Sequence, residues 1–492
     1  MPRYFGTDGV RGVALSELTV QMAETLGRAA VHNLGPRLLI GRDTRSSGTQ
    51  LQAGLIAGIT AAGGEALLAG VIPTPAVAYL TRTYAADGGV VISASHNPPE
   101  YNGIKFFDAQ GFKLDEQSEQ QFEDALQAQA IAAWEAGETS AINVAGEASA
   151  VSLAGEASAI SVTGDSSAAN TSNSSTCTEN LRPVTGAASS TEDLTDASER
   201  YIQHATQVFS SQGLDLTGLK IVVDCGHGAA FYTTPEALRR LGAELICLNC
   251  DFDGTDINVN SGSTHLEQLQ ASVLANAADL GFAHDGDADR VIAVDAQGNE
   301  VDGDFIKAIC AVDMKTQGKL AHNTVVSTVM ANFGFVKALR EQGIEVVLTD
   351  VGDSKVLAAM RDGGFTLGGE QSGHLIFLEH NSTGDGLVSA LQLLAAMRRS
   401  GLALHELSQI MEKYPQEMIN VTVSDKQKLS NSERLAAALQ AAETELGSEG
   451  RVLLRPSGTE PKFRVMVEAH DAQLAQRLAK QLAELVAAID SE

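Results

Sequence analysis

Basic residues are scarce in this chain of 492 residues. Lys and Arg together number 34, against 62 Asp and Glu, which gives a formal net charge of −28 at pH 7. Nucleic acids and anionic membrane surfaces are bound largely through clustered positive charge, so this balance argues against either as a partner. An anionic small-molecule substrate would need a pocket that is locally positive.

Long hydrophobic runs are also missing. No stretch approaches the roughly 20 apolar residues of a membrane span, and the first residues contain no apolar segment of the kind that forms the core of a signal peptide. The expected location of the protein is therefore the cytoplasm.

Cysteines are few. Five of them, an odd number in a large chain, do not describe a disulfide framework. Cys247 and Cys250 have the C-x-x-C spacing of redox and zinc sites, but the second ligand pair of a zinc site is missing at the usual spacing. We interpret these two cysteines as structural.

Aromatic residues are absent from one internal segment, residues 135–198. The segment opens with a nine-residue repeat, marked by Gly-acid pairs that begin at Gly137, Gly146, Gly155 and Gly164. It then becomes rich in Ser, Thr and Asn, and it carries nine acidic residues against one Arg. Such a composition has little to bury, so we predict a largely disordered insertion at a domain junction. A docking or β-pairing role is the alternative.

Elsewhere, short apolar runs alternate with helical patterns. In the first region, 18–33 and 50–62 have helical periodicity, whereas 37–40 and 89–92 are typical of buried strands. This alternation predicts mostly parallel sheets covered by helices, that is, an α/β fold. The length allows roughly three to four domains, which we place at 1–198 (with the insertion at 135–198), 199–300, 301–411 and 412–492, the last of them α+β.

One stretch near the end of the first region is organised around Ser95. The apolar run 89–92 leads into Ser93-Ala94-Ser95-His96-Asn97-Pro98. Pro98 and the proline after it supply no N–H to a sheet, and each disfavours helix at the preceding residue, so the strand must end here. Ser95 is therefore expected on an exposed turn, where an isolated Ser would usually be a plain turn-former.

A second stretch carries three carboxylates at alternate positions. Asp285, Asp287 and Asp289 follow the apolar run 280–283, and at this spacing they can converge on one hard cation that offsets their mutual repulsion. A calcium EF-hand is excluded, because its sixth position holds Arg290 and its twelfth holds Ala296. We predict a metal site, with a solvated acidic loop as the alternative.

Two further loops contain short polar side chains next to glycines. Residues 455–462 combine Arg455, Ser457, Gly458 and Thr459, which is a set of groups able to hold a phosphate dianion. Residues 368–374 place Glu370, Ser372 and His374 between glycines, an arrangement suited to the hydroxyls of a sugar. An ordinary turn is the alternative for each.

With Gly-Thr-Asp-Gly-Val-Arg at 6–11, these motifs and their order resemble those of the α-D-phosphohexomutase superfamily. The resemblance runs from Arg3 to the loop at 455–462 and is interrupted only by 135–198. It implies three related α/β domains with mixed or parallel sheets and a smaller C-terminal α+β domain. In such a fold the four domains surround a central cleft, and each contributes one loop to it.

The resemblance also implies a reaction. Phosphorylated Ser95 would transfer its phosphoryl group to a hexose 6-phosphate, and after the hexose 1,6-bisphosphate has turned over, Ser95 would take back the other phosphate. The enzyme would be an isomerase of phosphosugars that uses Mg²⁺. The implied metal ligands are Ser95, Asp285, Asp287 and Asp289. The implied substrate contacts are Thr7, His96, Arg290, Glu370, Ser372, His374, Arg455, Ser457, Gly458, Thr459 and Arg464.

Several questions stay open at this stage. Lys105 and Arg11 are candidates for proton transfer, whereas His96, adjacent to Ser95, is expected to shape the loop or contact the phosphate without folding back as its base. By resemblance to the family, Gln371 and Gly458 imply glucosamine phosphate, and hence a supply of cell-wall precursors, over glucose or mannose phosphate. A binding protein with a decayed site is the distant alternative. The oligomeric state is open, a homodimer included.

Overall fold

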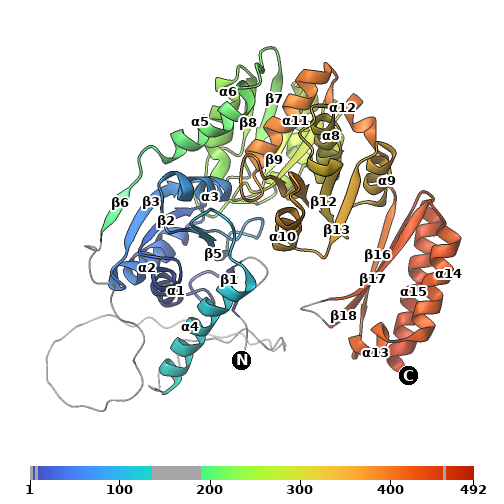
Figure 1. Ribbon diagram of the computed structural model, residues 1–492, viewed down its shortest axis with the longest axis horizontal. Coiled ribbons are helices and arrows are strands. Elements are labelled where there is room, and N and C mark those ends of the chain that lie inside the picture. Colours follow the sequence, from blue (N-terminus) through green and yellow to red (C-terminus); the bar gives the residue numbers. More distant parts are fainter. Residues whose placement is uncertain (1–3, 6–8, 136–189, 458–460) are drawn as a thin grey trace, which may run out of the picture.

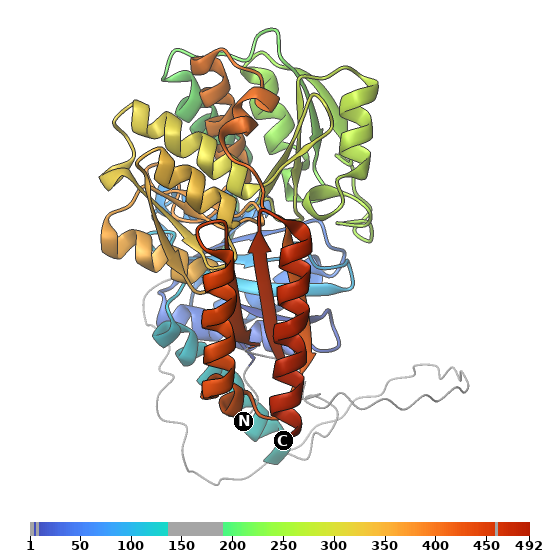
Figure 2. The same ribbon diagram turned by 90° about the vertical axis from the view of Figure 1, so that its right-hand side faces the viewer.

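The computed structural model describes residues 4–5, 9–135, 190–457 and 461–492. Four units follow one another in an arc, and the first and the last face each other across its open side (Figure 1). Seen from the side of the last unit, the two long helices of that unit lie in front of the others (Figure 2).

The first unit is built on a six-stranded sheet of order β1-β5-β4-β2-β3-β6. Strands β4, β2, β3 and β6 are parallel, whereas β5 pairs antiparallel with β4, and β1 in turn pairs antiparallel with β5. The strands are β1 (Val10–Val13), β2 (Arg37–Arg42), β3 (Glu65–Val71), β4 (Gly88–Ile92), β5 (Tyr101–Asp108) and β6 (Thr191–Asp193). The helices are α1 (Val20–Asn33), α2 (Gly48–Ala61), α3 (Thr74–Thr83) and α4 (Glu116–Glu135).

Helices cover both faces of this sheet. Leu26 of α1 and Leu55 of α2 share one core with Ile40, whereas Val77 of α3 belongs to a second core on the opposite face. That second core continues through Tyr201 into the next two units. Burial of apolar side chains therefore holds the first three units together.

The second unit has the sheet order β11-β10-β9-β7-β8. Its strands are β7 (Lys220–Asp224), β8 (Glu244–Leu248), β9 (Leu280–His284), β10 (Val291–Asp295) and β11 (Glu300–Val301). Its helices are α5 (Ala197–Ser210), η1 (Ala229–Phe231), α6 (Thr233–Arg240), η2 (Gly262–Thr264) and α7 (Glu267–Ala275). Strands β8, β7 and β9 are parallel, and β10 returns antiparallel to β9.

The third unit repeats this scheme with the order β13-β12-β14-β15. Its strands are β12 (Thr324–Thr328), β13 (Glu345–Thr349), β14 (Leu367–Gly369) and β15 (Leu375–Phe377). Its helices are α8 (Gly303–Thr316), η3 (Ala321–Asn323), α9 (Phe333–Glu341), α10 (Asp353–Gly363), α11 (Gly386–Ser400), α12 (Leu404–Leu407) and η4 (Ser408–Ile410). Strand β15 is again antiparallel to the last parallel strand.

The C-terminal unit is smaller, and its sheet of order β16-β18-β17 is antiparallel. Its elements are β16 (Gln416–Thr422), α13 (Lys426–Ser430), α14 (Glu433–Leu446), β17 (Gly450–Pro456), β18 (Lys462–Ala469) and α15 (Ala472–Ser491). The predicted fold class, three mixed α/β units and a smaller α+β unit, is confirmed.

The elements predicted in the first unit are confirmed as well. The helices predicted at 18–33 and 50–62 correspond to α1 and α2, and the strands predicted at 37–40 and 89–92 correspond to β2 and β4, with ends that differ by at most two residues. Within the described residues, no single helix is long and apolar enough to cross a membrane, although the bent pair formed by α11 and residues 404–410 passes on length and composition.

The predicted insertion ends earlier than expected. Residues 136–189 lie outside the described residues, but those that follow are part of the fold. The amide of Ala66 donates to the carbonyl of Ser190 at 2.9 Å, and β6 pairs parallel with β3. Leu194 is buried, and α5 begins at Ala197. The low-complexity interpretation was wrong for residues 190–198, where local composition is overridden by an open sheet edge and a buried leucine.

A deletion should therefore stop before Ser190. Replacing residues 138–188 with a Gly-Ser bridge is expected to leave both the melting temperature and kcat/KM within about twofold of the wild-type values, because no described contact would be removed. A bridge that also removes Thr191 should lower the melting temperature, since β6 loses its pairing. If the shorter deletion folds but loses activity, the segment takes part in function.

Candidate active site

Each unit presents a hairpin loop. In the first three units this loop leaves the carboxyl end of a parallel strand and returns antiparallel: β4 to β5 around Ser95, β9 to β10 around Asp287, and β14 to β15 around Ser372. The fourth loop joins β17 to β18 after Ser457. The carboxyl ends of parallel strands are where α/β proteins form their sites.

The backbone of Ser95 is held in an uncommon conformation. Its φ is 53°, in the left-handed region that residues other than glycine rarely adopt. Arg45, which is fully buried, donates from Nη2 to the Ser95 carbonyl at 3.0 Å, and Asn258 of the second unit donates to the same oxygen at 2.8 Å. Strain of this kind persists only where the surroundings enforce it, which is typical of functional loops.

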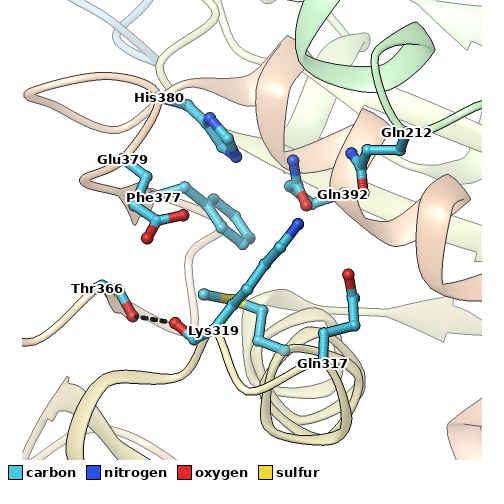
Figure 3. Close-up of a pocket in the computed structure, with 9 residues that line it drawn as sticks. Gln212, Gln317, Lys319, Thr366, Phe377, Glu379, His380 and Gln392 are labelled. Atoms are coloured by element: carbon cyan, nitrogen blue, oxygen red, sulfur yellow. Dashed lines mark hydrogen bonds between the residues drawn. The ribbon is translucent and has the colours of Figure 1, made fainter.

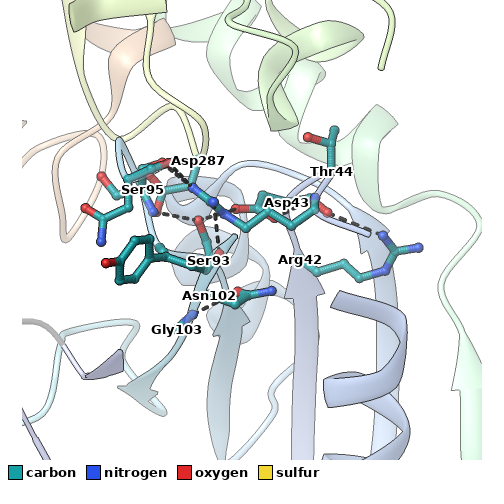
Figure 4. A network of polar contacts seen from close by, with 12 residues as sticks. Arg42, Asp43, Thr44, Ser93, Ser95, Asn102, Gly103 and Asp287 are labelled. Carbon is teal, nitrogen blue, oxygen red and sulfur yellow. Dashed lines mark hydrogen bonds and ion pairs between the residues drawn. The ribbon is translucent and has the colours of Figure 1, made fainter. Parts of the chain in front are cut away.

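Arg45 is fixed in turn by Asp43 (Figure 4). The guanidinium Nε lies 2.9 Å from Asp43 Oδ2, and the same carboxylate oxygen accepts from the Ser93 hydroxyl at 2.6 Å. The Ser93 hydroxyl accepts from the amide of Ser95 at 2.9 Å. Asp43 and Arg45, which follow β2 directly, thus supply the frame of the Ser95 loop.

The Ser95 hydroxyl points at the acidic triplet of the second unit. It donates from Oγ to Asp285 Oδ2 at 2.6 Å, and only 1% of the residue is exposed. His96 Nδ1 lies 3.3 Å from the same Oγ. The imidazole thus lies within reach of the hydroxyl next to the left-handed turn at Ser95, whereas the expectation that His96 does not serve as its base stays a prediction. Burial, together with Arg290 and Arg11, lowers the pKa of His96 to about 4, so its imidazole is neutral near pH 7.

The three carboxylates lie together and are all buried. Burial raises the pKa of Asp285 well above its usual range, and Asp289 and Asp287 act in the same direction. Burial alone would also raise the pKa of Asp289, but His374, Lys105 and Arg290 lower it below its usual range. Three neighbouring carboxylates can all be ionised only where enough positive charge surrounds them.

Lys105 of β5 supplies part of this charge. Its Nζ donates to Asp287 Oδ2 at 2.9 Å and lies 4.0 Å from Asp289 Oδ2. Thr74, at the start of α3, donates to the same Asp287 oxygen at 2.6 Å. Lys105 is 1% exposed, so this ammonium group sits in the protein interior beside the triplet.

The donor set fits a hard divalent cation. Asp287 Oδ1 and Asp289 Oδ1 are buried and have no hydrogen-bond partner among the described residues, and one oxygen from each of the three aspartates lies within 4.8 Å of the others. Oxygen-only ligands of this kind suit Mg²⁺. A buried carboxylate oxygen without a partner is costly, so a cation is the natural occupant.

The sugar loop predicted at 368–374 contacts the acidic triplet through His374 and lines a cavity through Ser372. His374 is buried and turns inward, with Nδ1 3.4 Å from Asp289 Oδ2. Ser372 lines an open cavity together with Arg290, whose Nε has no hydrogen-bond partner among the described residues. Glu370 accepts from the amide of Gly352 at 3.3 Å. The loop thus joins the acidic centre to a cavity that holds a guanidinium group.

The C-terminal unit carries the predicted phosphate residues. Arg455 of β17 lies directly opposite Arg464 of β18, which places two guanidinium-bearing residues at one register position beside the loop. Ser457 is buried. Gly458 and Thr459, and Thr7 of the first unit, lie outside the described residues. Arg11 of β1 donates from Nη1 to the carbonyl of Ala94 at 3.4 Å, so it borders the Ser95 loop.

Several contributors were missed in the sequence. Thr74 lies 21 residues before Ser95, and Asn258 belongs to the second unit. Nothing in the local sequence of either residue indicates a place in the site. Lys113 and Asp353 were also missed. These two form a buried ion pair between the first and third units, with side chains 10% and 12% exposed. Asp353 Oδ2 lies 3.7 Å from His374 Nε2, on the side of the ring away from Asp289.

The Lys113–Asp353 pair should affect metal binding through His374. Asp353→Asn is expected to weaken the affinity for Mn²⁺ about tenfold, because the pair helps to fix the imidazole that contacts Asp289, and residues that orient a metal ligand have effects of this size. Titration of the protein with Mn²⁺, followed by electron paramagnetic resonance, measures this directly. Asp350→Asn, which breaks the exposed pair with Lys355, is the control. Equal affinities for the two variants would contradict the prediction.

A second cavity lies elsewhere, between the second and third units. Lys319 extends among Gln317, Gln392 and Gln212, and the backbone carbonyl of Lys319 accepts from Thr366 at 3.2 Å (Figure 3). None of the predicted site residues that the structure describes lines it.

Comparison with known families divides the chain into four parts that correspond to the four units of the fold. Models of phosphoglucomutase/phosphomannomutase alpha/beta/alpha domains I, II and III match residues 2–132, 199–298 and 302–414, and the model of the C-terminal domain matches residues 418–485.

Full-length relatives are close. The chain is 46% identical to a phosphoglucosamine mutase of Desulforamulus reducens over 492 residues, which is 99% of each chain. It is also 46% identical to a phosphoglucosamine mutase of Mycolicibacterium paratuberculosis over 495 residues, covering 99% and 100%. Among solved structures, a phosphoglucomutase/phosphomannomutase family protein of Burkholderia thailandensis has a TM-score of 0.73 at 22% identity, covering 99% of this chain and 97% of the other. The last likeness shows the shared fold.

Proposed function

Because this chain belongs to the phosphoglucosamine mutase family, we propose that it interconverts glucosamine 6-phosphate and glucosamine 1-phosphate. The proposal includes a phosphorylated Ser95 and a 1,6-bisphosphate that turns over in the site. The observation that carries the chemistry is the hydroxyl of Ser95, held by a strained loop of one unit 2.6 Å from a carboxylate of the next.

The acidic triplet would hold Mg²⁺ through Asp285, Asp287 and Asp289, with the Ser95 side chain beside it. When bound, Mg²⁺ neutralises the charge that develops as a phosphoryl group is transferred in line. Lys105 remains paired with Asp287 and adds a positive charge at the same place. Arg45 and Asn258 bind the backbone carbonyl of Ser95 and so fix the turn that carries Oγ. Little reorganisation is then needed when Oγ donates or accepts the phosphoryl group.

Proton transfer has three candidates near Ser95. His96 is neutral near pH 7 and its Nδ1 lies 3.3 Å from Oγ, so it has the geometry of a proton acceptor. Lys105 and Arg11 border the same loop. We assign the positive charge of Arg11 and Lys105 to the transferring phosphoryl group, and we propose His96 as the additional group that contacts the Ser95 oxygen.

The remaining contacts would hold the substrate. Glu370 and Ser372 would meet the ring hydroxyls, and Arg290, which lines the cavity beside Ser372, would meet a phosphate. Arg455 and Arg464 would bind the phosphate that is not being transferred, because two arginines at one register position beside the loop can both donate N–H groups to it. The residues proposed beside them are Thr7, His374, Ser457, Gly458 and Thr459.

The test of the substrate is a comparison of kcat/KM for glucosamine 6-phosphate, glucose 6-phosphate and mannose 6-phosphate. The assays contain Mg²⁺ and a trace of hexose 1,6-bisphosphate as primer. We expect a preference of at least about tenfold for the amino sugar, equivalent to about 1.4 kcal/mol of transition-state discrimination. Equal or better turnover of the glucose or mannose phosphate would keep the mechanism and overturn the substrate.

A further inference from the structure

Asp302, at the N-terminus of α8, binds two segments that the reaction uses separately. Its Oδ1 caps the helix by accepting from the amides of Asp304 and Phe305 at 3.0 and 3.3 Å. Its Oδ2 accepts from Gln371 Nε2 at 3.2 Å and from Lys413 Nζ at 2.6 Å. Gln371 belongs to the sugar loop, and Lys413 belongs to the linker 411–415 that leads into the C-terminal unit.

The sugar loop rests directly on this first turn of α8. The amide of Gly303 donates to the Gln371 carbonyl at 3.0 Å. A Cβ at position 303 would lie 2.3 Å from the carbonyl oxygen of Glu370, so only glycine permits the close approach. The Asp302 side chain is 3% exposed. Movement of the turn would therefore move Glu370 and Gln371.

The linker is fastened to the same turn at a second point. Asn332 caps α9, and its backbone N–H donates to Asp304 Oδ2 at 2.7 Å. Its side chain accepts from the amide of Tyr414 at 2.9 Å and donates to the Tyr414 carbonyl at 3.0 Å. It also lies 3.2 Å from Glu468 of β18. Residues 413 and 414 of the linker are thus both tied to α8, one directly and one through Asn332.

Asp302, Gln371 and Lys413 also form one wall of the cavity that contains Arg290 and Ser372. Burial alone would lower the pKa of Lys413, but Asp302 raises it, so the linkage is an ion pair. The pair lies where the sugar loop and the C-terminal unit both face the cavity.

We propose that Lys413 is a positioning residue, which acts through Asp302 and Gln371 to set the sugar loop relative to the phosphate-binding C-terminal unit. This inference rests on the proposed function, in which the sugar and its distal phosphate are held by different units. The substrate must bind in two orientations. In each of them, the distance between the sugar loop and the phosphate-binding residues Arg455 and Arg464 has to match the distance between the sugar ring and its distal phosphate. A direct link between the two elements keeps this distance constant.

Lys337 provides a matched control on the other side of the same linker. It is 35% exposed at its side chain, against 45% for Lys413, and it donates to the Tyr414 hydroxyl at 2.9 Å and pairs with Glu449 at 2.8 Å. It thus joins the third and fourth units as Lys413 does. Among the described residues, its hydrogen-bond and ion-pair partners are Tyr414 and Glu449, neither of which belongs to the sugar loop.

The experiment compares Lys413→Met, Lys413→Arg and Lys337→Met in steady-state kinetics. For Lys413→Met we expect KM to rise about three- to tenfold in both directions of the reaction while kcat changes less than about twofold, because networked contacts couple on this scale. Lys413→Arg, which keeps the charge, should restore KM. Lys337→Met should leave KM unchanged.

Three results would overturn the proposal: an unchanged KM in Lys413→Met, an equal rise in Lys337→Met, or a KM in Lys413→Arg as high as in Lys413→Met. A fourth concerns direct contact. Competitive inhibition by inorganic phosphate should be the same in wild type and Lys413→Met, and if it weakens as much as substrate binding does, Lys413 is itself a phosphate ligand.

Coupling through Asp302 is tested with Gln371→Met, alone and combined with Lys413→Met. The combined effect on KM should be smaller than the product of the single effects, because both variants remove the same link. Independent effects would overturn the proposal.

The outcome can be separated from that of the proposed function. If wild type prefers glucose or mannose phosphate, the substrate assignment fails, and the same variants are measured with the preferred sugar. If it turns over none of them, the activity fails, and the coupling is measured by calorimetric titration with glucosamine 6-phosphate.

Discussion

Ser95→Ala is expected to abolish net isomerisation, with a loss of about 10³-fold or more, the size expected when a covalent nucleophile is removed. The Oγ atom of Ser95 is the hydroxyl that lies against Asp285 of the acidic triplet. Arg45 and Asn258 bind the backbone carbonyl of Ser95 and are untouched by the change. Activity is measured with glucosamine 6-phosphate and a bisphosphate primer. Intact mass after incubation with the primer shows whether the protein gains one phosphoryl group.

Ser389→Ala is the matched control, since this serine is also fully buried and, within the part of the chain that the structure describes, its hydroxyl makes only a long bond of 3.4 Å to the Leu375 carbonyl. The control should keep most of its activity and gain the phosphoryl group. If Ser95→Ala keeps most of its activity, or still gains the group, the assignment of Ser95 as the phosphoryl carrier is wrong.

Asp287→Asn should have the second largest effect, a loss of at least about 100-fold in kcat/KM together with much weaker metal binding. One oxygen of this carboxylate accepts hydrogen bonds from Lys105 and Thr74, and the other has no hydrogen-bond partner among the described residues. An amide removes the negative charge that a cation needs and leaves the buried Lys105 without its closest counter-charge. The Mg²⁺ dependence of the rate and the direct binding of Mn²⁺ are measured on the same preparation.

Asp295→Asn makes the same change at the far end of β10, where the carboxylate is also buried but caps a turn at Gln297 and Asn299. Its metal titration should match that of the wild type, with melting temperatures recorded for both variants. An unchanged Mg²⁺ titration in Asp287→Asn would mean that the triplet is not the metal site.

Much of the fold and of the chemistry could be predicted from local patterns. The alternation of apolar runs and helical periodicity depends on backbone geometry alone, so the α/β class and the elements around β2 and β4 were predicted correctly. Ser95 and the three aspartates each belong to a short motif. Within such a motif, the spacing along the loop already limits what the side chains can reach. Resemblance to a family added the order of the motifs and the reaction.

Contacts between segments distant in sequence could not be predicted in this way. Asn258 meets the Ser95 carbonyl across 163 positions, and Asp302 meets Lys413 across 111. Such pairs depend on how whole units pack, and neither residue has a local signature. The strand β6 is a similar case. Its three residues are exposed, and they form a strand because the edge of β3 is free to pair with them.

The sequence by itself thus determined which reactive groups are available: Ser95 before two prolines, the three alternating aspartates at 285–289, and the arginines near the glycine-containing loop at 455–462. These follow from short-range chemistry that no fold can change. Only the tertiary structure decided that His96 turns toward Ser95, that Lys105 lies buried against Asp287, and that α8 ties the sugar loop to the C-terminal linker. Packing fixes these relations because burial leaves a polar or charged group stable only next to a partner, and that partner is supplied by whichever unit the fold brings near.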